Sequence, residues 1–328
     1  MRSFQATGAK RFDVVEIGYT DPALVKLKVD LISPSITDVA LFQGKLNIEY
    51  PRTPCHMATG IVSEDRDEYG LKLGTRVLIN PYVQDIANRK YSLPKLHGVD
   101  KDGFLANFIE IPNENICPFP EDVKEDEAVF AHIVAVAVKA LQDIEIEKGM
   151  YISIIGGSLL SLVVAQLALY YQAIPILIAS DKRYLSLAEA GGVFYYIDDT
   201  KEDVVSKVFE ITGGRMSDYC ILHAFAGSTA TYMSALTANG GECRIVNLTS
   251  IYIPRIDVNL SEFTRKNLTI KGISCGFDSF NTAIHILAQK QISFDNYIDK
   301  RVDLEDAQEL FLELSKDPNM YIAPVIKA

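Results

Sequence analysis

Hydrophobic and polar positions follow two different periods along the chain. From about Glu127 to Leu248, short apolar runs rich in β-branched residues are followed by longer segments whose apolar residues recur at helical spacing. Such runs are typical of strands buried in a parallel sheet, and the short connections predict a doubly wound α/β domain. After a helix over 129–141, strands and helices are expected in turn over 151–155, 160–171, 175–179, 183–190, 194–197, 202–212, 220–223, 228–236 and 243–248.

The N-terminal third of the chain has the shorter period of strands. From Arg11 to about Glu125, alternating or apolar runs such as 24–31 and 76–80 are separated by Pro, Gly and Asn, with one polar loop over 83–95. This pattern predicts a strand-rich domain.

The tail after residue 268 returns to strands around two helices, which are expected over 279–289 and 304–314. We expect this tail to pair with the N-terminal strands. The chain is therefore expected to form one domain from residues 1–125 and 270–328 and a second, inserted domain from residues 126–269.

Composition narrows the class of protein. The 328 residues carry a net charge of −11, which disfavours nucleic acid and anionic membranes as partners because both repel an acidic surface. The N-terminus lacks an apolar core of signal-peptide length, and no other stretch is long and apolar enough for a membrane span. We therefore expect a soluble, cytoplasmic protein. The five cysteines are scattered singly and predict buried thiols.

The turn after the strand expected over 151–155 is the first candidate site. A helix that begins at such a turn leaves backbone N–H groups free to bind an anion, such as the pyrophosphate of a dinucleotide. The three positions of the G-x-G-x-x-G fingerprint hold Gly156, Ser158 and Ser161, so the motif is incomplete. The alternative is a turn that binds nothing. The candidate cofactor-binding residues here are Gly156, Gly157, Ser158, Leu159 and Leu160.

Several short motifs in order along the chain resemble the medium-chain dehydrogenase/reductase superfamily, most closely its alcohol and polyol dehydrogenase branch. This resemblance implies a GroES-like catalytic domain built from both chain ends and an inserted Rossmann domain that binds a dinucleotide. The motifs are PSITD at 34–38, PCHMATGIV at 54–62, GTRV at 74–77, DGFLANF at 102–108, GV at 192–193, GGEC at 240–243 and LTIKG at 268–272.

The resemblance also implies where a catalytic zinc would bind. The family uses a cysteine, a histidine followed by a glutamate, and a third cysteine or glutamate. Ser35, His56, Met57 and His132 occupy these positions here, so thiolate and carboxylate are both missing. His56 and His132 remain candidate ligands of a weakened metal site; alternatively, they are hydrogen-bonded without metal. Residues 81–98 contain no cysteine, so we expect no structural zinc.

Without a metal, the resemblance implies that side chains handle the proton. Thr37 matches the hydroxyl that relays the substrate proton, His56 or His132 is a candidate acid or base, and Asp38 would orient His56. The other interpretation makes Thr37 a turn hydroxyl and Asp38 a helix N-cap. The remaining histidines, His97, His223 and His285, belong to no motif and are expected to be structural.

The nicotinamide cofactor is predicted from the end of the second Rossmann strand. A carboxylate there binds the ribose hydroxyls of NAD, whereas its absence near cations suits the 2′-phosphate of NADP. The family's helix pattern aligns Ala179 with this position, followed by Ser180, Lys182 and Arg183 as candidate ribose-binding residues. A shift of two residues would place Asp181 there and favour NAD. We favour NADP.

These observations predict an NAD(P)-dependent oxidoreductase that moves hydride between the nicotinamide and a small alcohol or carbonyl compound. One alternative is a zinc-independent quinone or enone reductase, and another is a cofactor-binding relative without activity. The resemblance further implies a homo-oligomer, either a dimer or a tetramer, formed through the edge of the Rossmann sheet.

Overall fold

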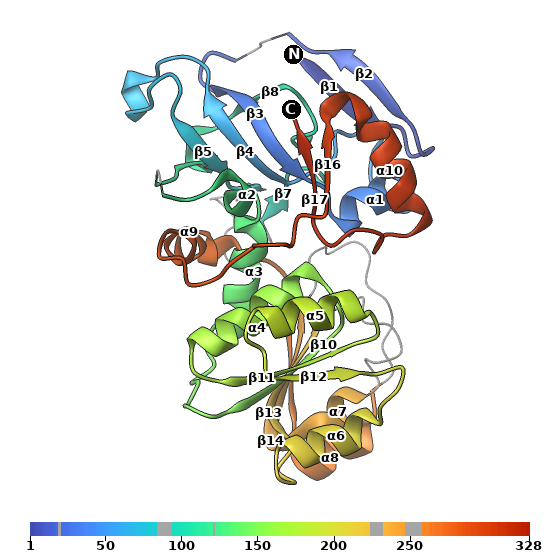
Figure 1. Ribbon diagram of the computed structural model, residues 1–328. Coiled ribbons are helices and arrows are strands. Elements are labelled where there is room, and N and C mark those ends of the chain that lie inside the picture. Colours follow the sequence, from blue (N-terminus) through green and yellow to red (C-terminus); the bar gives the residue numbers. More distant parts are fainter. Residues whose placement is uncertain (19–20, 84–93, 121, 224–231, 247–257) are drawn as a thin grey trace. The chain divides into compact units, whose positions relative to one another are not determined.

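The computed structural model describes residues 1–18, 21–83, 94–120, 122–223, 232–246 and 258–328 (Figure 1). The chain divides into two compact units. The β-rich unit comprises Met1–His132, Ile284–Gln289 and Phe294–Ala328, and the parallel-sheet unit comprises Ile133–Ala283 and Lys290–Ser293. The boundaries expected at 125/126 and 269/270 stay a prediction.

A seven-stranded sheet is the largest element of the β-rich unit. Its strand order is β16-β17-β3-β4-β5-β9, and β8 also pairs with β3. β17 runs antiparallel to β3, with Ile326 opposite Ile32, so the C-terminal tail extends the sheet of the N-terminal strands. The strands are β3 (Val25–Ser33), β4 (Met57–Val62), β5 (Arg76–Ile79), β8 (Phe108–Ile111), β9 (Ile116–Pro118), β16 (Lys300–Asp303) and β17 (Pro324–Lys327).

Two strand pairs and several helices complete the β-rich unit. The pairs are β1 (Arg2–Ala6) with β2 (Phe12–Glu16), and β6 (Tyr82–Val83) with β7 (Lys95–Leu96). The helices are α1 (Ile36–Phe42), α2 (Glu125–Ala128) and α10 (Ala307–Lys316), with 3₁₀ turns at Asp67–Tyr69, Asn113–Asn115 and Leu304–Asp306. Two more helices, α3 (Ala131–Leu141) and α9 (Phe280–Ala288), each contribute residues to both units.

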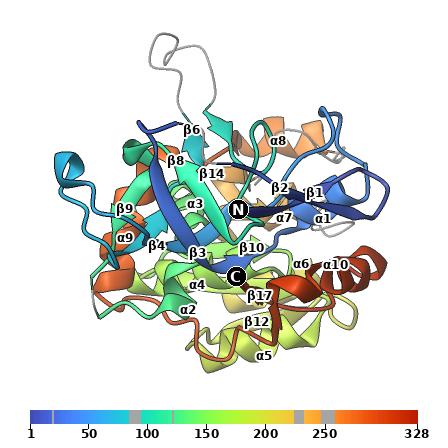
Figure 2. The same cartoon turned by 90° about the horizontal axis from the view of Figure 1, so that it is seen from above.

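Aromatic packing holds α1 beside α10 (Figure 2). The ring of Phe12 lies 4.6 Å from that of Phe42 on α1 and 5.0 Å from that of Phe311 on α10, measured between centroids. All three side chains are buried, and each such ring contributes about 3–5 kcal/mol relative to alanine. This cluster fixes α1, which carries Thr37 and Asp38.

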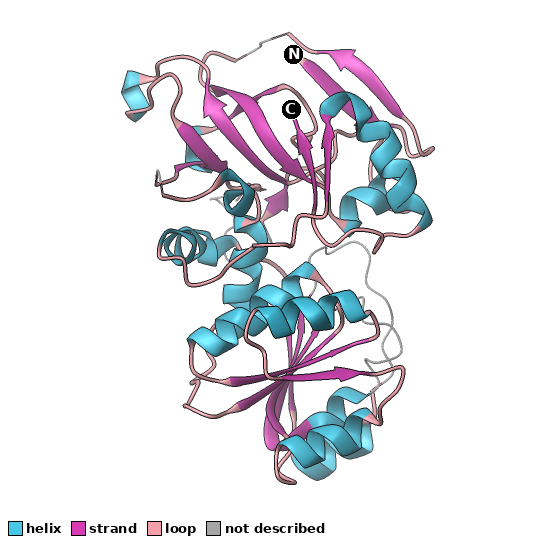
Figure 3. Cartoon of the chain, in the orientation of Figure 1, coloured by secondary structure: helices cyan, strands magenta, loops and turns pink. Residues whose placement is uncertain are grey.

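The parallel-sheet unit contains a six-stranded sheet with the order β12-β11-β10-β13-β14-β15, and Figure 3 shows helices on both of its sides. Every neighbouring pair of strands in it is parallel. The strand order reverses between β10 and β13, and ligands of such sheets bind at the carboxyl ends of the strands at this point. The strands are β10 (Tyr151–Ile155), β11 (Ile174–Ala179), β12 (Tyr195–Asp198), β13 (Ser217–His223), β14 (Thr237–Val246) and β15 (Thr269–Ile273).

Side-chain caps begin four helices of this unit. Ser158, Asp181, Asp203 and Asn259 each accept a hydrogen bond from a backbone N–H of the first turn that follows. Such caps satisfy N–H groups that would otherwise lack a partner. The helices are α4 (Leu159–Tyr170), α5 (Lys182–Ala190), α6 (Val204–Ile211), α7 (Met233–Leu236) and α8 (Leu260–Lys266), and a 3₁₀ turn spans Phe277–Ser279.

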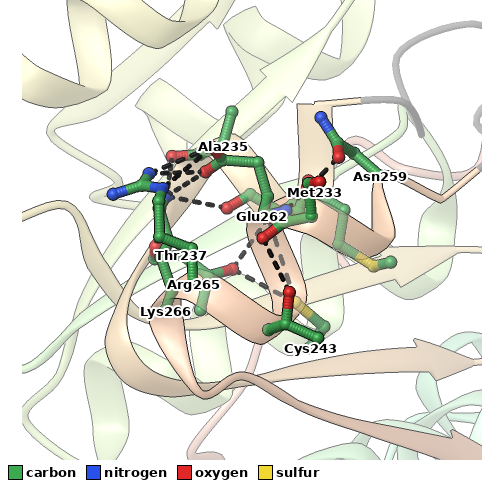
Figure 4. A network of polar contacts seen from close by, with 11 residues as sticks. Met233, Ala235, Thr237, Cys243, Asn259, Glu262, Arg265 and Lys266 are labelled. Atoms are coloured by element: carbon green, nitrogen blue, oxygen red, sulfur yellow. Dashed lines mark hydrogen bonds and ion pairs between the residues drawn. The ribbon is translucent and has the colours of Figure 1, made fainter.

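A buried lysine joins α7 to α8 (Figure 4). The ammonium group of Lys266 donates to the carbonyl oxygens of Ser234, Ala235 and Thr237 at 2.9, 3.1 and 3.0 Å. A carboxylate oxygen of Glu262 lies 3.4 Å from the same nitrogen. Because these carbonyls end α7, a positive charge there also suits the helix dipole.

The expected α/β fold class is confirmed, and the differences lie at the ends of elements. The helix expected over 129–141 is α3, which begins at Ala131 and is preceded by the short helix α2, and the helices expected from 279 and 304 begin as 3₁₀ turns. Parts of the expected loop 83–95, helix 228–236 and strand 243–248 lie outside the described residues. Within the described part of the chain, no helix has the length and apolar character needed to cross a membrane.

Candidate functional site

The carboxylate of Asp38 is fixed by the start of α1. Ser35 is the N-cap of this helix, and its N–H and hydroxyl both donate to Oδ2 of Asp38 at 2.7 Å. The backbone N–H of Asp38 donates back to the Ser35 hydroxyl, which completes a capping box. The alternative expectation that Asp38 is itself the N-cap is therefore wrong: it occupies the third helical position.

The other oxygen of Asp38 faces the segment that carries His56. Oδ1 accepts the backbone N–H of Cys55 at 2.7 Å and lies 3.7 Å from Nδ1 of His56. That second distance is too long for a hydrogen bond. Burial alone would raise the pKa of Asp38, but the His56 ring and the hydrogen bonds from Ser35 outweigh burial and lower the pKa. Asp38 is thus a buried anion beside His56.

Cys55 contributes to the site through its backbone conformation and packing. Its φ angle is +71°, and the segment with Gly98 and Gly103 packs so closely that a Cβ on Gly103 would lie 2.2 Å from the Cys55 carbonyl oxygen. Burial, with the charge of Asp38 in addition, raises the pKa of the Cys55 thiol well above its ordinary value. The thiol is therefore protonated near neutral pH.

His56 and His132 lie together inside the β-rich unit. Their ring centroids are 4.8 Å apart and the rings are nearly perpendicular. Nε2 of His132, on α3, is 2.8 Å from the hydroxyl of Tyr82 on β6. Burial lowers the pKa of His132 well below its ordinary value, and the neighbouring His56 adds to this effect. His132 is therefore uncharged near neutral pH.

Several buried polar atoms of these residues have no hydrogen-bond partner among the described residues. They are both ring nitrogens of His56, Nδ1 of His132 and the hydroxyl of Thr37. Buried polar atoms are nearly always paired in folded proteins, and leaving one unpaired costs about 1–3 kcal/mol. These atoms therefore indicate a polar ligand or water.

The donor set does not fit a catalytic zinc. The hydroxyl of Ser35, at the position of the family's cysteine, is engaged with Asp38, and Met57 cannot replace the missing glutamate. This leaves the two imidazoles of His56 and His132, whereas catalytic zinc usually has three protein ligands. Among the residues that the structure describes, no group of three or more His, Cys, Asp or Glu side chains is arranged to hold a metal.

Tyr82 is the member of this group that sequence reasoning missed. It is buried, and β6 pairs with β7 so that Tyr82 lies opposite Leu96. The only signal in the sequence is its place after the strand that contains GTRV, within the run Asn80-Pro81-Tyr82. Its contact with His132, 50 residues away, depends on the fold.

In the parallel-sheet unit, the turn after β10 has the form expected for a dinucleotide. Gly156 has a φ angle of +106°. A Cβ on Gly157 would lie 2.7 Å from the ring of Tyr184, so only glycine fits there. The hydroxyl of Ser158 accepts the N–H of Ser161 at 3.1 Å and caps α4. The two serines in the fingerprint therefore begin the helix.

The end of β11 carries the candidate residues for the adenosine ribose. Ala179, the last residue of β11, pairs with Asp198 on β12. Asp181 caps α5 and accepts Nε of Arg183 at 3.0 Å and Nη2 at 2.6 Å. Both carboxylate oxygens of Asp181 therefore accept hydrogen bonds from Arg183. These are the oxygens that would otherwise accept hydrogen bonds from the ribose hydroxyls of NAD.

Two lysines follow the ends of the neighbouring strands β11 and β12. Nζ of Lys201 lies 2.6 Å from a carboxylate oxygen of Asp198. The hydrogen bond with Asp198 raises the pKa of Lys201. Lys182 begins α5, directly after Asp181. Sequence reasoning named Lys182 but not Lys201, because the pairing of β11 with β12 that brings the two strand ends side by side depends on the fold.

Comparison with known proteins supports the two-part fold of the chain. Residues 21–121 match the family described as alcohol dehydrogenase GroES-like domain, and residues 160–289 match the family described as zinc-binding dehydrogenase.

Two curated relatives and one solved structure extend over nearly the whole chain. An uncharacterized zinc-type alcohol dehydrogenase-like protein of Haemophilus influenzae is 26% identical, with 91% of this chain and 90% of that protein covered. An L-threonine 3-dehydrogenase of Pyrococcus abyssi is 23% identical, with 96% and 94% covered. A zinc-binding dehydrogenase of Sinorhizobium meliloti, solved with NADP, has a TM-score of 0.87 at 20% identity, with 100% and 99% covered.

Proposed function

Because this chain belongs to the zinc-type alcohol dehydrogenase-like branch of the medium-chain dehydrogenase/reductase superfamily, we propose that it interconverts a small polar alcohol and its carbonyl compound with NADP. Its class, an NAD(P)-dependent oxidoreductase, follows from its relatives. The choice of substrate, the preference for NADP and the roles of individual residues are our proposal.

The reaction moves one hydride and one proton. A bound nicotinamide supplies the hydride to the carbonyl carbon, or accepts it in the reverse direction. In the direction of oxidation, the hydroxyl of Thr37 would accept the proton of the alcohol while its own proton passes to His56, so that Thr37 stays neutral throughout. The carboxylate of Asp38, 3.7 Å from Nδ1, would stabilise the His56 ring that carries the proton.

The observation that carries the proposal is the turn Gly156-Gly157-Ser158 at the carboxyl end of β10. It lies beside the point where the strand order reverses, and the first-turn N–H groups of Leu159 and Leu160 suit a pyrophosphate. For the ribose we propose Ala179, Ser180, Lys182 and Arg183.

We further propose that the chemistry runs without a resident zinc, since the donor set leaves two imidazoles. A donor set of only two imidazoles also supports a second candidate function, which is reduction of an activated double bond in a quinone or enone. For both functions the partner is a small molecule. We also propose a cytoplasmic homo-oligomer, a dimer or a tetramer, formed through an edge of the six-stranded sheet.

The test is a fluorescence titration of the chain with NADPH and NADH, followed by a turnover screen. The screen contains L-threonine, vicinal diols, α-hydroxy ketones, a quinone and an enone. We expect tighter binding of NADPH and turnover of a diol or an α-hydroxy ketone. Binding with turnover of the quinone or enone alone would select the second candidate, and binding without any turnover would favour an inactive relative.

A pair of glycine variants controls for the fold. Gly157→Ala places a methyl group against Tyr184 and is expected to weaken NADPH binding at least tenfold. Gly272→Ala, on β15 in the same unit, meets no atom within 4 Å and is expected to change binding less than twofold. Equal effects from the two variants would show that the turn does not bind the cofactor.

A further inference from the structure

We infer that Tyr184 is a positioning residue for the dinucleotide, because its ring supports the turn between β10 and α4. The inference rests on the proposed function, in which this turn binds the pyrophosphate, and adds the side chain that sets the position of the turn. Tyr184 lies on α5 and is buried, and it belongs to no candidate site predicted from the sequence.

The ring of Tyr184 lies directly against Gly157. A Cβ on Gly157 would be 2.7 Å from Cδ2 of Tyr184, 3.1 Å from its Cγ and 3.3 Å from Cβ of Ala179, the last residue of β11. Ordinary contacts of a Cβ begin at 3.4 Å, so a methyl group at position 157 would move the turn and the ring apart by about 0.7 Å. The ring therefore fills the space that a side chain at position 157 would occupy.

Glycine at position 157 is a requirement of this chain and not of the dinucleotide fingerprint. In G-x-G-x-x-G the residue between the first two glycine positions is unrestricted, and here it is Gly157. The φ angle of Gly157 lies outside the left-handed region, in contrast to +106° at Gly156, so the backbone itself accepts a side chain. The obstacle is therefore steric and comes mainly from Tyr184.

Tyr184 connects the two parts of the candidate cofactor site. It directly follows Lys182 and Arg183, which are proposed for the ribose, and α5 lies beside α4 and β11 (Figure 1). Residues 156–159 are only half-buried, so the turn keeps a side that a ligand can reach. Hydrogen bonds to a phosphate weaken when their donors shift by a fraction of an ångström. A turn that moves away from Tyr184 should therefore bind the pyrophosphate less tightly.

The test is a double-mutant cycle measured by fluorescence titration with NADPH and NADH. Gly157→Ala is expected to weaken NADPH binding at least tenfold in the unsubstituted chain, but less than threefold in Tyr184→Ala, where the methyl group has space. Tyr184→Ala alone is expected to weaken NADPH and NADH by the same factor, about tenfold, since both carry the pyrophosphate.

Tyr151→Ala is the matched control. Tyr151 is the first residue of β10, at the opposite end of this strand from the turn, and it packs against the apolar core of the same unit. This substitution should leave both affinities within twofold of the unsubstituted chain. In the Tyr151→Ala background, Gly157→Ala should still weaken NADPH binding at least tenfold.

Melting temperatures without cofactor provide a second measurement, which does not depend on the folding of Tyr184→Ala. Because the methyl group meets a side chain of the protein itself, Gly157→Ala is expected to lower the melting temperature by about 3 °C or more. Gly272→Ala meets no atom within 4 Å and should not lower it.

Three outcomes would overturn the inference and leave the proposed function in place. The first is the same loss from Gly157→Ala with and without Tyr184, which would mean that the methyl group meets the cofactor. The second is a Tyr184→Ala chain that binds NADH as tightly as the unsubstituted chain does. The third is an unchanged melting temperature in Gly157→Ala. An unsubstituted chain that binds neither cofactor would overturn the proposed function together with the inference.

Discussion

The carboxylate of Asp38 accepts the backbone N–H of Cys55 at 2.7 Å, while the ring of the next residue, His56, remains 3.7 Å away. One carboxylate thus ties the start of α1 to the segment before β4 and places a negative charge beside His56. The same capping box engages Ser35, which stands at the position of a metal-binding cysteine in the family. In this chain that position therefore belongs to the architecture of the helix.

Substitutions of Ser35 and Asp38 should separate the stability contributed by the helix cap from that contributed by the hydrogen bond between Asp38 and Cys55. Ser35→Ala removes one cap and is expected to lower the free energy of unfolding by about 1 kcal/mol. Asp38→Ala also leaves the Cys55 N–H without its partner, so a loss of about 3 kcal/mol is expected. Urea denaturation of both variants measures the difference. Equal losses would mean that the bond to Cys55 adds nothing.

A second prediction concerns Lys266 in the parallel-sheet unit. Lys266→Met keeps much of the side chain but leaves three buried carbonyl oxygens without their donor, so a loss of about 3 kcal/mol is expected. The control is Arg265→Met on the same helix, whose exposed ion pair with Glu262 is worth less than about 1 kcal/mol. Thermal or urea unfolding compares them, and similar losses would contradict a special role for Lys266.

Patterns of neighbouring residues predicted the strands, turns and helices that are determined by the sequence around them. The apolar run 151–155 and the two glycines after it predicted β10 and its turn, because strand, turn and helix follow one another directly. The tail's return to strands was likewise visible in its pattern. The helix expected from 129 begins at Ala131 instead, because Val129 and Phe130 continue the apolar pattern although they lie between α2 and α3.

The sequence patterns did not predict which distant segments contact one another. The resemblance brought His56 and His132 to one site, but nothing local signals that Tyr82 joins them, since that contact depends on the pairing of β6 with β7. Cys55, whose N–H donates to Asp38, likewise has a positive φ angle. A cysteine in the sequence does not predict this backbone conformation. One-dimensional patterns predict which face a residue occupies, whereas the partners on that face come from tertiary packing.

His223, at the carboxyl end of β13, predicts a pH dependence of stability. Burial lowers the pKa of His223 from 6.5 to about 4. The unfolded chain therefore binds more protons than the folded chain between these values, and the free energy of unfolding falls as the pH drops from 6.5 to 4. In His223→Gln, the decrease in the free energy of unfolding between pH 7 and pH 4 should be smaller than in the unsubstituted chain by about 3 kcal/mol. Denaturation of both chains at pH 7 and pH 4 measures it, and parallel losses would contradict the assignment.

The lysines beside the end of β11 lead to a prediction about cofactor choice. Lys182 and Lys201 follow the ends of the neighbouring strands β11 and β12, while Asp181 is engaged by Arg183, so the site is expected to attract the 2′-phosphate of NADPH. Lys201→Ala should weaken NADPH binding about tenfold and leave NADH binding within twofold, since only NADPH carries that phosphate.

The matched control is Lys207→Ala on α6, whose ammonium pairs with Glu210 at 3.2 Å and with Glu202 at 3.9 Å. It removes one positive charge from the same unit and should leave both affinities unchanged. Fluorescence titrations at low and high salt distinguish a local contact from the general field, because exposed charges that act at a distance are screened by salt. If Lys201→Ala weakens NADH and NADPH equally, Lys201 supports the fold of the site and does not select the cofactor.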